Sequence, residues 1–205
     1  MKVRRACSSD SKDIWNWRND PKTRENSVNQ NEVSWSDHHA WFTHSLANDS
    51  RAIYIGLCRN SGDSMGVVLF DFDADLATSE VSINIAPQWR RKNHSKDLLK
   101  SAIKEFQSNR AYVMTAKIKS NNISSIKCFE GCGFTLEATS DGFLIYKSKQ
   151  AIIDAIEQVR STNNVNWMDL LRLAFKVAPK EAQEIVRRIN NDDGKISDLL
   201  KRLGN

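Results

Sequence analysis

Residues 80–95 read EVSINIAPQWRRKNHS, and this stretch decides the fold. Apolar and polar residues alternate from Glu80 to Ile85, which is typical of a strand with one buried face. Pro87 ends the strand, and a basic turn leads into an amphipathic helix over 95–106. Because the first turn of a helix presents unpaired backbone N–H groups and the positive end of the helix dipole, this turn predicts an anion-binding site.

Outward from this stretch, hydrophobic periodicity predicts a mixed α/β domain with a mainly antiparallel central sheet flanked by helices. We expect strands at 3–6, 51–58, 65–72, 80–85, 112–118, 134–136 and 142–146, and helices at 8–19, 37–46, 95–106 and 124–131. Pro21 stops the first helix, and the polar segment 22–34 is predicted to be irregular. Ser36 is the expected N-cap of the next helix.

After Lys147 the pattern becomes entirely helical. Helical patterns cover 151–160, 167–177, 179–190 and 196–203, with breaks at Asn163-Asn164, Ala178-Pro179 and Asp193-Gly194. We therefore expect two domains, residues 1–148 and a small all-α appendage at residues 149–205. The appendage is too small for a large core of its own, so we expect it to dock on the first domain, on a second copy in a homo-oligomer, or on a partner enzyme.

Composition excludes several classes of protein. The chain has 205 residues, a formal net charge of +5 and 40% hydrophobic residues, which is enough for a core. No stripe of Lys and Arg with interleaved aromatic residues occurs, so we expect no nucleic-acid binding. Residues 1–9 lack an apolar segment, and no stretch approaches the ~18 apolar residues of a membrane span, so we expect a cytoplasmic protein. The four cysteines form no CxxC pair, which predicts reduced, mostly buried thiols and no metal site.

Two motifs resemble the GNAT superfamily of N-acetyltransferases. Residues 83–95 look like the family's strand, turn and acyl-CoA loop, Q/R-x-x-G-x-G/A, with Arg90, Asn93 and Ser95 at the motif positions. Residues 122–134, NISSIKCFEGCGF, resemble the family's N-x-x-S-I-x-x-F/Y-E-x-x-G-F and form the more specific match. The resemblance covers about residues 2 to 147 and implies a GNAT-like fold.

The resemblance implies acetyl-CoA as the co-substrate and no metal. The backbone of 83–85 would pair with the pantetheine arm, the basic loop would hold the diphosphate, and Asn122 would position the pantetheine. The implied cofactor-binding residues are Ile83, Asn84, Ile85, Arg90, Arg91, Lys92, Asn93, His94, Ser95 and Asn122. Arg91 and Asn93 stand where the family usually has glycine, so a basic turn before an ordinary surface helix is the other interpretation of this segment.

Transfer of an acetyl group to an amine needs a base, and Glu80 is our candidate. It lies on the polar face of the strand that would bear the thioester; otherwise it is a solvated strand carboxylate. Many relatives place a tyrosine, acting as general acid, where this sequence has Phe129, which cannot donate a proton. His38, Tyr146 or water could take that place.

The N-terminal region resembles a GNAT subgroup that acetylates nucleotide-linked 4-amino sugars in surface-glycan pathways, including those leading to pseudaminic and other nonulosonic acids. The likeness rests on W-R-N-D-P at 17–21, on Arg24, and on H-H-A-W-F at 38–42. The implied substrate-binding residues are Trp17, Asn19, Asp20, Arg24, His38 and Trp41. Two alternatives remain: acetylation of a protein N-terminus, as in ribosomal-protein acetyltransferases, and a degenerate CoA-binding scaffold without activity.

Overall fold

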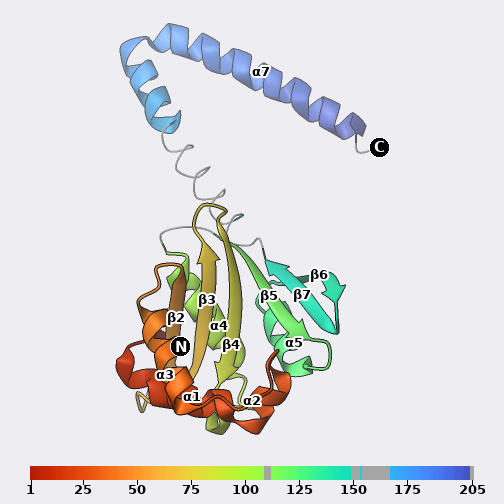
Figure 1. Cartoon of the computed structure of the whole chain (residues 1–205). Helices are drawn as coiled ribbons and strands as arrows, with labels where there is room; N and C mark the ends of the chain where they lie inside the picture. Colours follow the sequence, from red (N-terminus) through yellow and green to blue (C-terminus); the bar gives the residue numbers. More distant parts are fainter. Residues whose placement is uncertain (109–111, 149–152, 154–166, 204–205) are drawn as a thin grey trace. The chain divides into compact units, whose positions relative to one another are not determined.

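The computed structural model describes residues 1–108, 112–148, 153 and 167–203 (Figure 1). The chain divides into two compact units, Met1–Asp154 and Ala155–Asn205. The helix predicted at 151–160 falls outside the described residues, apart from residue 153.

The first unit is built on a seven-stranded sheet with the order β1-β2-β3-β4-β5-β7-β6. The strands are β1 (Lys2–Arg5), β2 (Arg51–Leu57), β3 (Ser64–Asp73), β4 (Thr78–Ile85), β5 (Val113–Lys119), β6 (Thr135–Ser140) and β7 (Phe143–Ser148). All neighbouring strands run antiparallel except β4 and β5, which run parallel. The predicted α/β class with a mainly antiparallel sheet is therefore confirmed.

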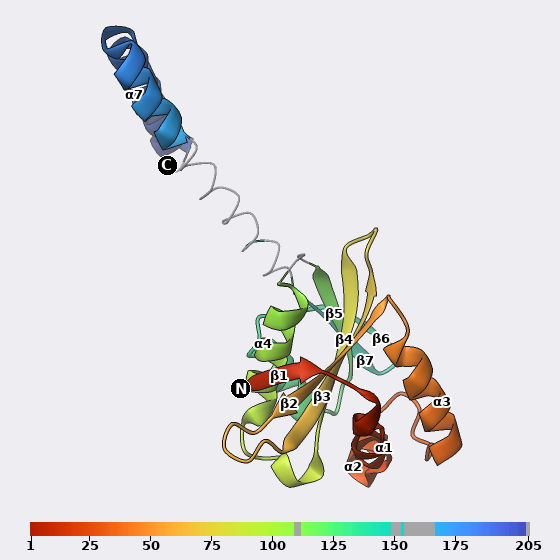
Figure 2. The same ribbon diagram turned by 90° about the vertical axis from the view of Figure 1, so that its left-hand side faces the viewer.

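Helices cover both faces of this sheet (Figure 2). They are α1 (Ser11–Asn19), α2 (Pro21–Asn26), α3 (Trp35–Leu46), α4 (His94–Phe106) and α5 (Ile123–Glu130). On one face, Leu98 and Leu99 of α4 pack against Val81 of β4 in the larger core cluster. On the other, Trp17 of α1 and Phe42 of α3 form a second cluster. Alternation along β4 turns its polar residues, at 80, 82 and 84, toward the face covered by α1 to α3.

Helix α2 occupies part of the segment that the sequence predicts to be irregular. Pro21 ends α1 as expected, but it then opens α2. The N–H of the first helical residue has no partner within a helix, so proline, which lacks this N–H, is tolerated there. The Asp20 side chain caps the new helix by accepting a hydrogen bond from the Thr23 N–H at 3.1 Å. The prediction was wrong because one proline both stops the first helix and begins the second.

Two helix starts also differ from the sequence expectation. The N-cap of α3 is Ser34, whose Oγ accepts a hydrogen bond from the Asp37 N–H at 3.1 Å, and Ser36 lies inside the first turn. Helix α4 begins at His94, after an N-cap residue, Asn93, in the left-handed region. The shift at α3 follows from the spacing of the side-chain bond, since an N-cap oxygen reaches the N–H of the second or third helical residue.

In the second unit, residues 167–177 are helical and α7 runs without interruption from Pro179 to Leu203. The break predicted at Asp193-Gly194 is wrong. A glycine inside a helix costs about 1 kcal/mol relative to alanine, and the helix continues through Gly194 despite this cost.

Within the described part of the chain, no helix combines the length and apolar character that crossing a membrane requires. The four cysteines form no disulfide, but the prediction that most of them are buried is wrong: Cys128 is buried, Cys7 is exposed, and Cys58 and Cys132 are partly exposed.

Candidate active site

The central feature of the first unit is a split between β4 and β5. The two strands pair at 78–80 with 113–115, and beyond Glu80 and Thr115 the pairing stops. Figure 1 shows the strands parting from that point. Residues 81–85 keep their ladder with β3 and residues 116–119 keep theirs with β7. The strand edges that face the split therefore present backbone N–H and C=O groups that a ligand can pair with.

A cleft of about 1620 Å³ opens at this split. Its described lining has more cations than carboxylates. The cations are Arg18, Lys22, Arg90, Arg91, Lys96, Lys117 and Lys127, and the carboxylates are Glu25, Asp37 and Glu80. A concave site with this excess of positive charge favours an anionic ligand.

The loop before α4 adopts the backbone geometry of an anion-binding turn. Arg91 and Asn93 both have positive φ, 60° and 58°, although neither is glycine. Left-handed residues interleaved with ordinary ones turn successive N–H groups toward one side, which makes a concave anion site. Asn93 makes no side-chain hydrogen bond to the first turn of α4, so no cap occupies those N–H groups. The loop and the start of α4 thus fit a diphosphate group, and both line the cleft.

We expect this geometry to be strained at Arg91. Arg91→Gly should raise the free energy of unfolding by about 1 kcal/mol, because glycine adopts positive φ without a Cβ clash. The matched control is Lys92→Gly, where φ is not positive; this variant should lose about 1 kcal/mol. Urea unfolding of both variants measures the difference, and equal destabilisation would show that Arg91 carries no strain.

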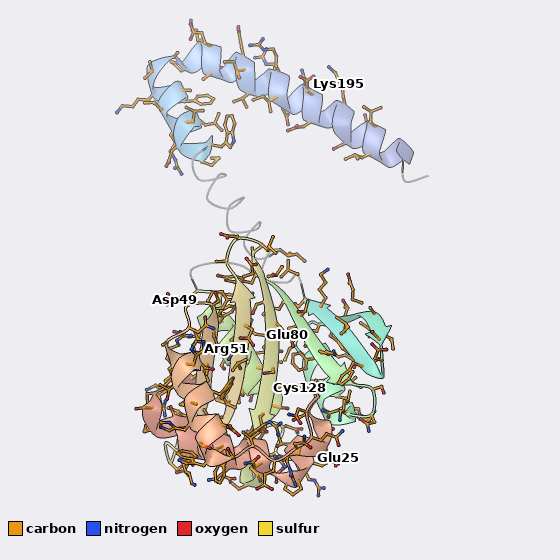
Figure 3. All side chains as sticks on the ribbon, in the orientation of Figure 1. Glu25, Asp49, Arg51, Glu80, Cys128 and Lys195 are labelled. Atoms are coloured by element: carbon orange, nitrogen blue, oxygen red, sulfur yellow. The ribbon has the colours of Figure 1, made fainter. Side chains whose placement is uncertain are left out.

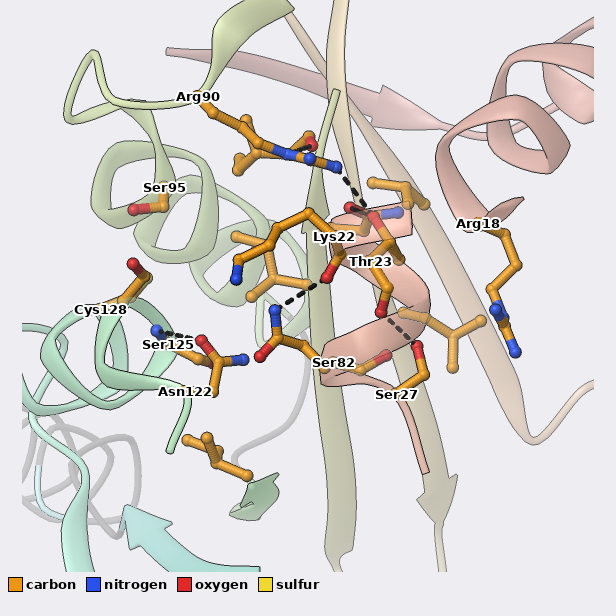
Figure 4. A pocket seen from close by; sticks show the side chains of 18 of the residues that line it. Arg18, Lys22, Thr23, Ser27, Ser82, Arg90, Ser95, Asn122, Ser125 and Cys128 are labelled. Carbon is orange, nitrogen blue, oxygen red and sulfur yellow. Dashed lines mark hydrogen bonds between the residues drawn. The ribbon is translucent and has the colours of Figure 1, made fainter. Parts of the chain in front are cut away.

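The Arg90 side chain points away from Ser95, at the start of α4, and joins the loop to α2 (Figure 4). Its guanidinium bonds to Asp20 Oδ1 at 2.5 Å and donates to Thr23 Oγ1 at 2.8 Å and to the Ile85 carbonyl at 3.1 Å. Burial opposes ionisation of Asp20, but the bonds from Arg90 and from the Thr23 N–H outweigh it and lower the pKa of that carboxyl. Lys92 lies outside the cleft lining, with its ammonium 5.0 Å from the centre of the Trp89 ring.

The second sequence motif borders the opposite side of the cleft. Asn122 lines the cleft and also caps α5, since its Oδ1 accepts a hydrogen bond from the Ser125 N–H at 3.2 Å. Phe129 lines the cleft and packs edge-to-face against Phe134, with ring centroids 5.0 Å apart. Tyr146 is not among the described lining residues, and its hydroxyl donates to Glu130 at 2.9 Å. Tyr146 is therefore not placed to donate a proton in the cleft.

Glu80 lies at the apex of the split. It is the last β4 residue paired with β5, opposite Thr115, and its partner on β3 is Asp71. The side chain is exposed and lines the cleft on the face covered by α1 to α3 (Figure 3). A carboxylate at this point can reach a group held against the end of the unpaired strand edges.

Two of the predicted acceptor residues, His38 and Trp41, line the cleft. His38 is buried and stacks on Phe42, with ring centroids 5.8 Å apart. Its Nε2 lies 2.9 Å from the Ser11 carbonyl, which can only accept, so Nε2 carries the proton and Nδ1 is an acceptor. Burial lowers the pKa of His38, which favours the neutral ring.

The other four residues that were predicted to bind the acceptor substrate are not among the described lining residues. They stabilise the segments that form the wall of the cleft. Trp17 is 5% exposed and packs in the core. The Asn19 amide bonds to both backbone groups of Val33, at 2.8 and 2.9 Å, and so ties the segment before α3 to α1. Asp20 caps α2, and Arg24 lies 3.7 Å from the Glu32 carboxylate.

Five cations in the lining were missed at the sequence level: Arg18, Lys22, Lys96, Lys117 and Lys127. Arg18 donates to the Asn29 carbonyl at 2.7 Å, while its second terminal nitrogen is buried without a partner. Burial, followed by the charge of Arg24, lowers the pKa of Arg18, which marks a site where an anion would be stabilising. The sequence could have pointed to Arg18 as a site residue, because it lies inside the W-R-N-D-P motif.

Among the described residues, no group of three or more His, Cys, Asp and Glu side chains is placed to hold a metal ion.

Comparison with protein families identifies the class of protein. Residues 1–135 match the family model described as acetyltransferase (GNAT) domain. The match spans well over half of the chain, so the chain belongs to the GNAT acetyltransferase family and is an acyl-CoA-dependent N-acetyltransferase. This confirms the enzyme class and the superfamily that the motifs predict. No curated protein sequence matches the chain significantly.

Solved structures share the fold at low identity. A domain from Methanocaldococcus jannaschii gives a TM-score of 0.63 at 22% identity, covering 71% of this chain and 96% of that chain. Spermidine N-acetyltransferase from Vibrio cholerae, in complex with CoA and spermine, gives 0.63 at 15% identity, with 71% and 92% covered. AAC(6')-Ib, in complex with ribostamycin and coenzyme A, gives 0.63 at 18% identity, with 74% and 94% covered. At these identities the likeness establishes the fold.

Proposed function

We propose that this enzyme transfers an acetyl group from acetyl-CoA to the 4-amino group of a nucleotide-linked amino sugar. The observation that carries the proposal is the distribution of charge in the cleft, where Glu80 lies at the apex and Arg18, Lys22 and Lys117 line the same cleft. An acceptor with an amine at one end and phosphates at the other matches this arrangement.

Polyamine acceptors fit the cleft less well. Spermine, bound by the Vibrio cholerae relative, and ribostamycin, bound by AAC(6')-Ib, carry several amino groups and no phosphate. Cations in the lining, including the desolvated Arg18, would repel such molecules. The same cations would attract the diphosphate of a nucleotide sugar, and Trp41 offers an aromatic face to a base or sugar ring.

In this proposal the diphosphate of the cofactor lies against the N–H groups of residues 91–95, and its pantetheine arm lies between β4 and β5. Asn122 stands beside that arm, and His94 and Ser95 supply the first turn of α4. The side chain of Arg90 holds the loop in place through Asp20 and Thr23. The assignment replaces the expected direct role of Arg90 with a positioning role.

The residues of the split provide the chemistry. Bound acetyl-CoA supplies a thioester carbonyl for attack by the amine. Glu80 accepts a proton from the amine, directly or through one water molecule. An unpaired N–H of β4, in 83–85, donates a hydrogen bond to the carbonyl oxygen as negative charge develops on it. Phe129 contributes an apolar wall, so the proton for the departing sulfur comes from water or from another group in the cleft.

Acceptor profiling tests this proposal. Release of the CoA thiol should be fastest with a nucleotide-linked 4-amino sugar, and slower with the free amino sugar, a peptide with a free N-terminus, or spermidine. Arg18→Met should raise KM for the nucleotide sugar about tenfold, because a bond to a charged group contributes roughly 1.5–3 kcal/mol. Arg59→Met, at an exposed turn residue, is the matched control. Faster turnover of the peptide or of spermidine would overturn the proposal.

A further inference from the structure

The side chain of Arg51 joins three elements of the first unit. Arg51 is the first residue of β2 (Figure 3). Its guanidinium forms an ion pair with Asp71 of β3 and donates a hydrogen bond to Ser45 Oγ of α3 at 2.8 Å. It also lies over the Trp41 ring of α3, 5.7 Å from the ring centre. One side chain therefore links β2 and β3 to the helix that carries Trp41.

These contacts hold the Arg51 guanidinium in one place. Asp71 is the partner of Arg51 in the register of β2 and β3, so the two side chains extend from the same face of the sheet. Ser45 is 1% exposed, and the bond from Arg51 gives its buried hydroxyl a partner. A planar guanidinium can bond to a carboxylate and a hydroxyl with its nitrogens while its flat face meets an aromatic ring.

Trp41 is the member of this network that reaches the cleft. It is 41% exposed and lines the cleft, so its ring has surface left for a ligand. A cation within about 6 Å of a ring centre attracts the ring through its quadrupole. A side chain that is free to rotate loses that freedom when a ligand stacks on it, which weakens binding. A guanidinium that restrains the ring beforehand reduces this cost.

The network lies on the same face of the sheet as the proposed base. Asp71 is the register partner of Arg51 on one side and of Glu80 on the other, so the three residues form a row across β2, β3 and β4. Neighbouring strands are about 4.8 Å apart, which places Arg51 about 10 Å from Glu80 along the row. Trp41 and Glu80 both line the cleft, so one ligand can meet both.

We propose that Arg51 is a positioning residue for the acceptor, because it holds Trp41 in the orientation in which the ring stacks on the acceptor. This inference rests on the proposed function, which assigns the Trp41 ring to a base or a sugar. Arg51 is not among the described lining residues, so it acts through Trp41 and does not touch the acceptor. Loss of the guanidinium frees the ring, and binding of the acceptor then has to order it.

Fluorine NMR of the full chain labelled with 5-fluorotryptophan tests the positioning without any acceptor. The chain has six tryptophans, and Trp41→Leu identifies the Trp41 resonance by its loss. Arg51→Met should shift that resonance and leave the other five in place, and Arg51→Lys, which keeps the charge but not the planar fork, should shift it less. An unmoved Trp41 resonance in both variants, or a change of all six in the milder Arg51→Lys, would overturn the proposal.

Arg5→Met is the matched control. Arg5 also lies over an aromatic ring, with its guanidinium carbon 5.2 Å from the centre of the Tyr54 ring. Tyr54 belongs to the larger core cluster and is not among the described residues that line the cleft. Arg5→Met should therefore leave the Trp41 resonance unchanged, and a shift as large as that in Arg51→Met would contradict a specific role of Arg51.

Kinetics with a nucleotide-linked 4-amino sugar tests the effect on the acceptor. Arg51→Met should raise KM for this acceptor about fivefold, or about 1 kcal/mol, since ordering a free side chain on binding has a cost on that scale. The kcat, and the CoA affinity measured by calorimetry, should stay within about twofold, a combination that a general loss of structure would not give. An unchanged KM would contradict the role of Arg51 in acceptor binding.

A double-mutant cycle assigns the effect to Trp41. In a Trp41→Leu background, Arg51→Met should raise KM by less than about twofold more, because the ring through which the guanidinium acts is absent. Additive effects of the two substitutions would overturn the proposal. A parent chain that does not acetylate the nucleotide-linked amino sugar would contradict the proposed function and would leave the NMR result standing.

Discussion

Replacement of Glu80 by glutamine should lower kcat/KM about a hundredfold or more and leave the affinity for acetyl-CoA unchanged. A positioned general base contributes about 10²–10⁴ to rate, and glutamine keeps the size of the side chain while losing its basicity. Glu80 is exposed at the apex of the split and is not held by an ion pair to a described residue, so the substitution should cost little stability. Steady-state kinetics of thiol release across a range of pH measures the effect.

Glu137→Gln is the matched control for this experiment. Glu137 is an exposed carboxylate on β6 that pairs with Lys147 at 3.1 Å, and it does not line the cleft. Its replacement should leave kcat/KM within about twofold, since exposed ion pairs contribute about 0–1 kcal/mol. If Glu80→Gln behaved like this control at every pH, Glu80 would not be the base.

Ser95→Glu should reduce the affinity for CoA at least about a hundredfold. Ser95 is the second residue of α4 and lines the cleft, so a carboxylate there would lie close to the diphosphate. Two like charges about 4 Å apart repel by about 4 kcal/mol at the effective dielectric constant of a protein surface. An acidic side chain in the first turn also stabilises a helix, so a loss of binding would not come from unfolding.

Thr139→Glu adds the same charge on the exposed edge strand β6, away from the cleft lining, and should leave CoA affinity unchanged. Calorimetric titration of both variants, with thermal unfolding as a check on the fold, measures the effect. If Ser95→Glu bound CoA as tightly as Thr139→Glu, the diphosphate would not lie at the start of α4.

The architecture was predictable where the sequence pattern has one meaning. Alternation from Glu80 to Ile85 assigns β4 and its buried face without knowledge of the neighbours. Helix α2 was not predictable in the same way, because Pro21 after a helix is compatible with a loop and with the first turn of a new helix. The bonds that Arg90 makes to Asp20 and Thr23, which support this helix, come from a residue far along the chain.

The candidate site was likewise predictable only in part. The loop from Arg90 to Ser95 and Asn122 were predicted from motifs, and the structure brings Asn122 and all of the loop except Lys92 to one cleft. Trp17 was assigned to the acceptor because an aromatic residue beside polar ones fits both a stacking platform and a core, and the structure packs it in the core. Lys117 was missed because its importance depends on the divergence of β5 from β4, which no local pattern encodes.

The most direct test of the central claim is a crystal structure of the chain grown with excess CoA. We expect the diphosphate oxygens within hydrogen-bonding distance of the N–H groups of residues 91–95, and the pantetheine arm bonded to the free edges of β4 and β5 beyond Glu80 and Thr115. A cleft that stays empty of cofactor, or that side chains fill, would contradict the assignment of the split as the acetyl-CoA site.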